Sequence, residues 1–257
     1  MMEDFSRKEI GTAVIIYKDQ HSDLAGIMAE IVERTGALVR ENLGLNPAQR
    51  CELHILEDWG SFIDQAAPQY LRLLLRLLKP LWQGRMERTF QVAGGWMLPW
   101  GKKLSVGIKP PDILGRSQSE LGKRLFVPVP DLLEKFRHLT CHEYTHACTA
   151  HLRLPFWLNE GLAMRMVDYL AGYQTVLENT HALGMTESTI RQLRKATRLA
   201  AESSEALLEL YSGGYWLVRE LEGADPLFLR NLLSRKRTSR EIISRIQSVS
   251  DSIAVFQ

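Results

Sequence analysis

His142-Glu143-Tyr144-Thr145-His146, in the middle of the chain, forms an H-E-x-x-H pattern whose spacing becomes useful on a helix. Two helical residues four apart lie on the same face, so both imidazoles point to one side, and Glu143 points toward that side as well. Neutral imidazoles suit zinc, and a carboxylate beside a zinc site can accept a proton from water. The pentapeptide therefore predicts a metal-binding helix with two histidine ligands and Glu143 as a base.

The residues on either side of the pentapeptide extend this prediction. Upstream, Pro130-Asp131 is typical of a helix start, and the apolar spacing that follows predicts a helix over roughly residues 130–153. Downstream, Pro155 ends that helix and opens a second one, in which Glu160 lies early enough to reach the same site. A catalytic zinc ion takes three protein ligands and keeps one open position. His142, His146 and Glu160 are therefore the predicted zinc ligands.

Two motifs together resemble the peptidase-MA-like group of gluzincin zinc metallopeptidases. The first is the H-E-x-x-H pattern followed by Ala147, and the second is Leu154-Pro155-Phe156-Trp157-Leu158-Asn159-Glu160-Gly161-Leu162-Ala163, which matches W-x-x-E-G-hydrophobic-A. The resemblance implies zinc-dependent hydrolysis of peptide bonds, with Glu143 as the catalytic base and a peptide or protein as substrate. It also implies a tyrosine that stabilises the oxyanion. Tyr211 matches that position, and Tyr215 is the second choice.

The resemblance further implies an α+β, zincin-like fold. We expect a small mixed sheet packed on the H-E-x-x-H helix, followed by a helical C-terminal subdomain. The predicted division is an N-terminal α/β portion, residues 1–129, and a helical catalytic portion, residues 130–257. A looser resemblance runs from the first strand to the C-terminal helices.

The N-terminal portion shows strand and helix patterns in a β-α-β order. Thr12–Tyr17, which is rich in β-branched residues, and Cys51–Leu56 are predicted to be strands, and the segment between them is predicted to be a helix that Ser22 caps and Gly44 ends. No G-x-G-x-x-G follows the first strand, so the sequence does not support a nucleotide site. Residues 68–79 predict a short helix rich in leucine and arginine, and we expect its arginine side chains to face solvent.

From Gly94 to Pro130 the sequence favours strands and turns. We expect Leu104–Ile108 to be the edge strand that binds the substrate peptide, with Gly94–Trp100 as a lip beside it. A further strand is predicted at Leu125–Val129, after a loop over residues 110–122 that could gate the cleft.

The C-terminal third is predicted to be helical. One helix is expected within 172–205, a second at Glu205–Glu220 and a third after Asp225-Pro226. Residues 238–241, Thr-Ser-Arg-Glu, form a capping box for a last helix. Basic residues between 230 and 245 are expected to be solvated helix ends, so no nucleic-acid partner is predicted.

Three alternatives to an active gluzincin peptidase are considered. The histidine pair could make only structural hydrogen bonds while Glu160 caps its helix. The protein could also be an inactive zincin-fold binding or regulatory protein, because the position four residues after Glu160, where thermolysin-type relatives carry an orienting aspartate, is Met164. Asn159, Asp168 or a main-chain carbonyl could take that role. An SprT-like DNA-associated protease is disfavoured, since those proteins use a third histidine in place of the glutamate.

The composition is that of an ordinary globular protein. The chain has 257 residues, a net charge of +2, 45% hydrophobic and 24% charged residues. The acidic start Met1-Met2-Glu3-Asp4 does not resemble a secretory signal, and no apolar run reaches the roughly 20 residues that a membrane helix needs. The three cysteines are too few for a disulfide framework and are expected to be buried. We therefore expect a cytoplasmic protein with no membrane partner, and the sequence leaves the oligomeric state open.

Overall fold

The structure is a computed structural model that describes residues 5–101, 103–116, 120–183, 204–235 and 238–254. Helices and strands together make the chain a mixed α+β protein with one small sheet, as predicted. The chain forms two compact units. The first unit contains residues 1–34, 48–119 and 129–147, and the second contains residues 35–47, 120–128 and 148–257.

The sheet of the first unit has five strands in the order β1-β2-β3-β5-β4. Their bounds are β1 Ser6–Ile10, β2 Ala13–Tyr17, β3 Cys51–Ile55, β4 Gly95–Trp100 and β5 Lys103–Ile108. The pairs β2–β3 and β3–β5 are parallel, whereas β1–β2 and β4–β5 are antiparallel. The two strands predicted at Thr12–Tyr17 and Cys51–Leu56 are confirmed as β2 and β3.

The prediction that Leu104–Ile108 is the edge strand is wrong. β5 lies between β3 and β4, pairing Leu53 with Val106 on one side and Trp96 with Gly107 on the other. The edge strands of the described sheet are β1 and β4, and β4 is the segment that was expected to be only a lip. Val106 and Ile108 are fully buried, which is usual for a strand covered on both faces.

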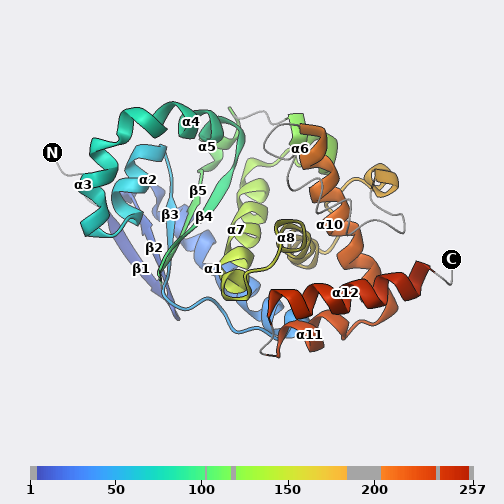
Figure 1. The fold of residues 1–257 in the computed structure, drawn as a ribbon. Coiled ribbons are helices and arrows are strands. Elements are labelled where there is room, and N and C mark those ends of the chain that lie inside the picture. The colour runs from blue at the N-terminus through green and yellow to red at the C-terminus, as the bar shows by residue number, and fades with distance from the viewer. Residues whose placement is uncertain (1–4, 102, 117–119, 184–203, 236–237, 255–257) are drawn as a thin grey trace. The chain divides into compact units, whose positions relative to one another are not determined.

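The helices of the first unit cover both faces of this sheet. Figure 1 shows α2, α3 and α4 on one face of the sheet and α7 on the other. Their bounds are α2 Trp59–Ala66, α3 Gln69–Leu77, α4 Lys79–Val92, α5 Pro111–Leu114 and α7 Leu132–Thr149. Helix α1, Ser22–Leu43, follows a short 3₁₀ turn, η1 Asp19–His21, and ends at Gly44, whose φ of +66° is the left-handed conformation expected of a terminating glycine. The predicted end at Gly44 is confirmed, whereas Ser22, which was predicted to cap the helix, has helical backbone angles and follows η1 directly.

Alternate residues of β4 face opposite sides of the sheet, as the period of a strand requires. Trp96, Leu98 and Trp100 pack on an aromatic cluster formed by α2, which includes Trp59 and Phe62. Gly95, the first residue of β4, lies against Glu143 of α7. The edge strand is therefore held by aromatic packing on one face and approaches α7 with its backbone on the other.

Helix α3 confirms the predicted helix at 68–79. Arg76 is exposed, as expected, and forms a hydrogen bond with Asp64 of α2, whereas Arg72 is half-buried and donates to carbonyls at the C-terminal end of α2. Leu73 and Leu77 are also exposed, which was not predicted.

The second unit is helical. Its elements are α6 Glu120–Leu125, η2 Ala150–Leu152, α8 Phe156–Ala171, η3 Glu178–Leu183, α10 Ser204–Ala224, α11 Phe228–Leu233 and α12 Ser239–Ala254. Its core packs side chains of α6, α8 and α10 together, among them Leu125, Met164 and Tyr215. The strand predicted at Leu125–Val129 is wrong, because that segment contributes one isolated bridge, Phe126 to Val176.

The C-terminal predictions are confirmed where the structure describes them. The Thr238 N–H donates to Glu241 Oε2 at 2.7 Å and the Glu241 N–H donates to Thr238 Oγ1 at 3.3 Å, which is a capping box at the start of α12. The helix expected within 172–205 falls mostly on residues 184–203, outside the described residues. Among the described helices, none has both the length and the apolar character needed to cross a bilayer.

Candidate metal centre

Helix α7 carries the H-E-x-x-H pattern as predicted. Asp131 accepts a hydrogen bond from the Leu133 N–H at 2.9 Å and so caps the start of the helix. The helix ends at Thr149, earlier than expected, because a 3₁₀ turn leads to Arg153 in the left-handed conformation with a φ of 50°. His142 and His146 therefore lie one turn apart on a continuous helix.

The two histidine rings approach each other closely. His142 Nε2 and His146 Nε2 are 3.1 Å apart, and the ring planes are nearly perpendicular, at 89°. Two ligands held about 2.0–2.1 Å from a tetrahedral zinc ion would lie about 3.3 Å apart. The pair thus has the separation of two ligands of one ion.

Glu160 completes the group. Pro155 caps helix α8, and Glu160 is the fifth residue of that helix. One ligand atom from each of His142, His146 and Glu160 lies within 4.8 Å of the other two, and His146 and Glu160 are both buried. A buried carboxylate is costly unless it is paired with a charge or a metal. The donor set of two imidazoles and one carboxylate fits zinc, and this buried group could hold a metal ion.

Glu143 is also buried, and the edge strand β4 passes directly beside it. A Cβ atom placed on Gly95 would lie 2.6 Å from Glu143 Cγ and 3.1 Å from Oε1. No side chain fits at position 95 unless Glu143 moves. Gly95 was not among the predicted site residues, although the Gly94-Gly95 pair before an alternating aromatic strand is a signal of close backbone approach.

The helix that carries Glu160 is pressed against α10. A Cβ atom on Gly161 would lie 2.3 Å from the Gly214 carbonyl oxygen, and one on Gly214 would lie 2.0 Å from the Trp157 carbonyl oxygen. Gly214 therefore allows α10 to pack closely on α8. The glycine of the W-x-x-E-G motif has a steric role, since it allows the backbones of α8 and α10 to touch.

The two tyrosines considered as oxyanion donors differ in their surroundings. Tyr215 is fully buried and its hydroxyl donates to Asp168 Oδ2 at 2.6 Å, while burial raises the pKa of Tyr215. Its hydroxyl is thus already engaged. Tyr211 is half-buried, and its ring packs edge-to-face on Phe156 at a centroid distance of 5.7 Å. The role of Tyr211 stays a prediction.

The proposed substitutes for the missing orienting aspartate have other hydrogen bonds. Asn159 Oδ1 accepts from Thr149 Oγ1 at 2.7 Å. Asp168 Oδ1 accepts from the backbone and hydroxyl of Thr175, and its Oδ2 accepts from Tyr215 and Arg165. The hydrogen bonds of Asp168 therefore link α8 to α10 and to the segment that follows α8.

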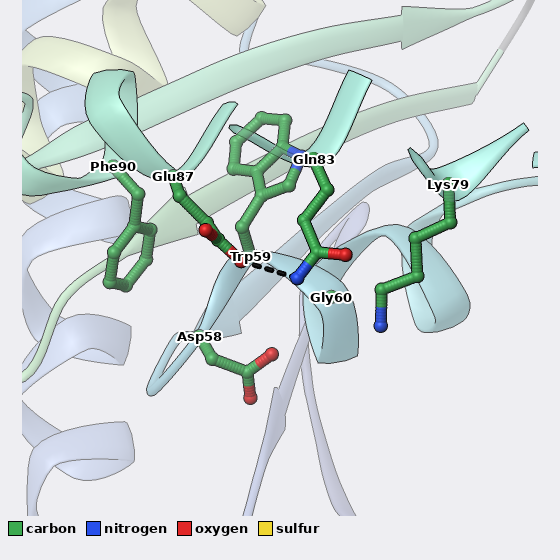
Figure 2. Close-up of a pocket in the computed structure, with 7 residues that line it drawn as sticks. All are labelled: Asp58, Trp59, Gly60, Lys79, Gln83, Glu87 and Phe90. Atoms are coloured by element: carbon green, nitrogen blue, oxygen red, sulfur yellow. Dashed lines mark hydrogen bonds between the residues drawn. The ribbon is translucent and has the colours of Figure 1, made fainter. Parts of the chain in front are cut away.

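A cavity of about 260 Å³ lies elsewhere in the first unit, on the opposite face of the sheet from α7. Figure 2 shows its lining, in which Trp59 and Phe90 lie among charged and polar side chains of α2 and α4, and Gln83 donates to Glu87 at 2.5 Å. It contains no histidine, cysteine or serine among its lining residues. The metal group is the better candidate for a functional site.

No known family model matches this chain, and no curated protein is similar to it. A function for the chain must therefore be argued from its two motifs and from the geometry of the group that they form.

Proposed function

We propose that the protein is a zinc metallopeptidase of the gluzincin type that hydrolyses peptide bonds. The observation that carries this proposal is the buried group of His142, His146 and Glu160, whose ligand atoms lie within 4.8 Å of one another. The proposal includes a zincin-like fold, in which a small mixed sheet packs on the helix that carries the histidines.

Each residue of the group has a distinct role in this proposal. His142, His146 and Glu160 would hold the ion, leaving one position open. When bound, zinc supplies Lewis acidity, which polarises the scissile carbonyl and makes water more acidic. Glu143 accepts the proton of the attacking water and delivers it to the leaving amine. Tyr211 donates a hydrogen bond to the oxyanion that develops on the carbonyl.

The edge strand β4 supports a peptide as the substrate. Within the described sheet β4 pairs on one side with β5, so its other side presents main-chain donors and acceptors. An extended peptide added to that edge would gain main-chain hydrogen bonds. Because Gly95 lies against Glu143, such a peptide would run past the base.

A second candidate function is metal binding without turnover. The observation that favours it is that Asp168, one of the residues considered for the orienting role, has both carboxylate oxygens bonded to Thr175, Tyr215 and Arg165. Poor orientation of the ligands lowers both metal affinity and activity. The two functions share the site and differ only in catalysis.

Zinc quantification and peptide cleavage on one preparation test the proposal. We expect about one zinc per chain in the wild type, and cleavage of at least some members of a random peptide library. His142→Ala should lose zinc and cleavage, whereas Glu143→Gln should keep zinc and lose cleavage by a factor of about 10³ or more. The exposed residues His151 and Glu209 provide matched controls, because His151→Ala and Glu209→Gln should change neither quantity.

Two results would contradict the proposal. The first is a wild-type protein that lacks stoichiometric zinc and has the same zinc content as His142→Ala, which would rule out the metal site. Equal cleavage by wild type and Glu143→Gln would remove the proposed base. Zinc binding with no cleavage of any peptide would favour the second candidate function.

A further inference from the structure

The hydrogen-bond register of β4 and β5 shows which main-chain groups lie on the outer edge of β4, the side away from β5. The Lys109 N–H donates to the Gly94 carbonyl at 3.0 Å, and these residues lie opposite each other, next to the pair of Gly95 and Ile108. Bonded and non-bonded pairs alternate along an antiparallel ladder, so every second residue of β4 turns its N–H and C=O away from β5. These residues are Gly95, Met97 and Pro99.

The other side of β5 agrees with this register. The Leu104 N–H and the Ile108 carbonyl bond to main-chain groups of the residues that flank β3, at 3.2 Å and 2.8 Å. Leu104 and Ile108 thus turn these groups toward β3, and their partners in β4 are Pro99 and Gly95. Neither of those partners bonds to β5, as the alternation requires.

Gly95 and Met97 offer a complete set of bonds on the outer edge. Each has one main-chain donor and one acceptor there, and within the described ranges no other main-chain group bonds to them on that side. An antiparallel strand added to this edge would exchange two hydrogen bonds with each of the two residues. The edge can therefore hold an extended peptide beside Gly95 and Met97.

Pro99 is the residue at which this pairing ends. Proline has no N–H, and its ring occupies the place from which the amide hydrogen would reach a partner strand. Pro99 is exposed, so its ring stands at the surface of the edge. A strand that pairs with Gly95 and Met97 would lose a donor at Pro99 and would meet the ring instead. Regular pairing on the outer edge therefore stops after Met97.

The two ends of the outer edge differ in what lies beside them. Gly95 lies against the proposed base, Glu143, and Figure 1 shows β4 beside α7, the helix that carries this base. A strand rises about 3.4 Å per residue, so Met97 lies about 7 Å and Pro99 about 14 Å along the edge from Gly95. The regular pairing therefore covers only the part of a peptide that is nearest to the base.

We propose that Pro99 limits the length of peptide that the protein recognises. Main-chain recognition would reach from the residue opposite Gly95 to the residue opposite Met97, a stretch of about three peptide residues, and no further. In an antiparallel peptide, the residues beyond Met97 lie toward the peptide N-terminus. Short extended segments are then bound as tightly as long ones. This inference rests on the proposed peptidase function, because it takes a peptide as the ligand of this edge.

Binding of a peptide series to Glu143→Gln tests the inference without requiring cleavage. A parent peptide is selected from a library by its binding to this zinc-loaded variant, and it is then shortened and lengthened at its N-terminus one residue at a time. We expect the Kd to fall until the residue opposite Met97 is present and to change by less than about twofold with further residues. The wild type is assayed for cleavage of the same peptides.

Pro99→Ala in the Glu143→Gln background should extend the series. Alanine restores an N–H and removes the ring, so a longer peptide can form two more hydrogen bonds with the edge. We expect the Kd of the longer peptides to fall about fivefold, while peptides that end opposite Met97 bind as before. Pro226→Ala is the matched control, because Pro226 is also exposed and lies outside the sheet, and it should leave the series unchanged. Circular dichroism checks that both proline variants stay folded.

Four outcomes decide the inference. It is overturned if the affinity of Glu143→Gln keeps rising with peptide length, or if Pro99→Ala stops at the same length, and cleavage by the wild type would leave the peptidase proposal intact in both cases. Failure of every library peptide to bind also overturns it. The expected length dependence without cleavage by the wild type would support the inference and contradict the peptidase proposal.

Self-association of Pro99→Ala is measured by light scattering on the same samples. A variant that self-associates and binds long peptides no better than its parent would overturn the inference. Pro99 would then serve to keep the edge from pairing with a second copy of the chain.

Discussion

Gly161 and Gly214 bring the backbones of α8 and α10 into direct contact. A Cβ atom on Gly161 would lie 2.3 Å from the Gly214 carbonyl oxygen, much closer than a carbon atom can approach an oxygen. Glu160 precedes Gly161 in the chain, so this contact fixes the backbone next to the proposed third ligand against α10. Arg165 strengthens the same pair of helices by donating to Glu222 at 2.6 Å.

Gly161→Ala should destabilise the second unit and displace Glu160. The added methyl group would meet backbone atoms, which cannot rotate away, so the helices must separate. Overpacking of this kind costs about 1–3 kcal/mol. Urea unfolding measures the loss in free energy, and zinc content measured on the folded variant should fall as well.

Gly223→Ala is the matched control in α10. A Cβ atom at that position would have no neighbour within 4 Å, and Gly223 has no positive φ. Alanine in an exposed helix stabilises by about 0.5–1 kcal/mol relative to glycine. If Gly161→Ala were as stable as Gly223→Ala, the close contact between α8 and α10 would be wrong.

Gly95→Ala should lower peptide cleavage without removing zinc. The new methyl group would lie 2.6 Å from Glu143 Cγ, so the base must move while the histidines keep their helix. A misplacement of about 1 Å can cost a factor of 10² in rate. The measurement is the kcat of the variant beside its zinc content.

Gly94→Ala controls for general strain in the same segment. Its methyl group would meet Leu139 Cδ1 at 2.5 Å, and no atom of Glu143 is among its nearest contacts. We expect a loss of stability with a smaller loss of kcat. Equal loss of kcat in both variants would mean that the effect of Gly95→Ala does not act through Glu143.

Asp168→Asn should destabilise the protein through its buried hydrogen bonds. The asparagine side chain would keep one acceptor oxygen. Its NH₂ group would then face either the donors of Tyr215 and Arg165 or those of Thr175, depending on how the amide is turned. Leaving buried polar groups mismatched costs about 1–3 kcal/mol. In a double-mutant cycle with Tyr215→Phe, the two changes should be non-additive by about 0.5–3 kcal/mol, and additive values would contradict a direct bond.

Acid should destabilise the sheet through Glu52. Burial raises the pKa of Glu52, but the contacts with His54 and with Lys103, at 2.7 Å, outweigh it and lower that pKa from 4.5 to about 2. The unfolded chain therefore binds more protons between these values, so stability present above pH 4.5 is lost as the pH falls toward 2. Burial also lowers the pKa of His54, so the protein loses further stability as the pH falls below 6.5.

The pH effect is measured as the free energy of urea unfolding of zinc-free protein. Glu52→Gln should be less stable than the wild type above pH 4.5, and its stability should depend less on pH between 4.5 and about 2. Parallel pH profiles for the two proteins would show that Glu52 does not titrate with a lowered pKa.

Removal of zinc should lower the melting temperature of the wild type. A ligand that binds only the folded protein stabilises it by about 4 kcal/mol when its concentration is 1,000 times the Kd. Chelation should therefore lower the melting temperatures of the wild type and of Glu143→Gln by similar amounts. His142→Ala should be insensitive to chelator, and a shift of the same size in that variant would place the zinc elsewhere.

Local patterns predicted the elements whose signals lie within one segment. The strands β2 and β3, the end of α1 at Gly44, the start of α8 after Pro155 and the capping box of α12 follow from side chains close in sequence. The edge strand was wrong because pairing order depends on which strands meet in space. β5 pairs with β4, the strand just before it in the chain, and also with β3, which comes from a distant segment, and the six residues of β5 do not indicate the second pairing.

The sequence by itself determined the metal-ligand candidates, since the helical period places His142 and His146 on one face and the W-x-x-E-G motif marks Glu160. Only the tertiary structure brought Glu160 to the histidines, placed Gly95 against Glu143, engaged Asp168 with Tyr215 and turned the leucines of α3 outward. The physical reason is that periodicity specifies which side chains share a face. What that face contacts depends on packing between segments far apart in the chain.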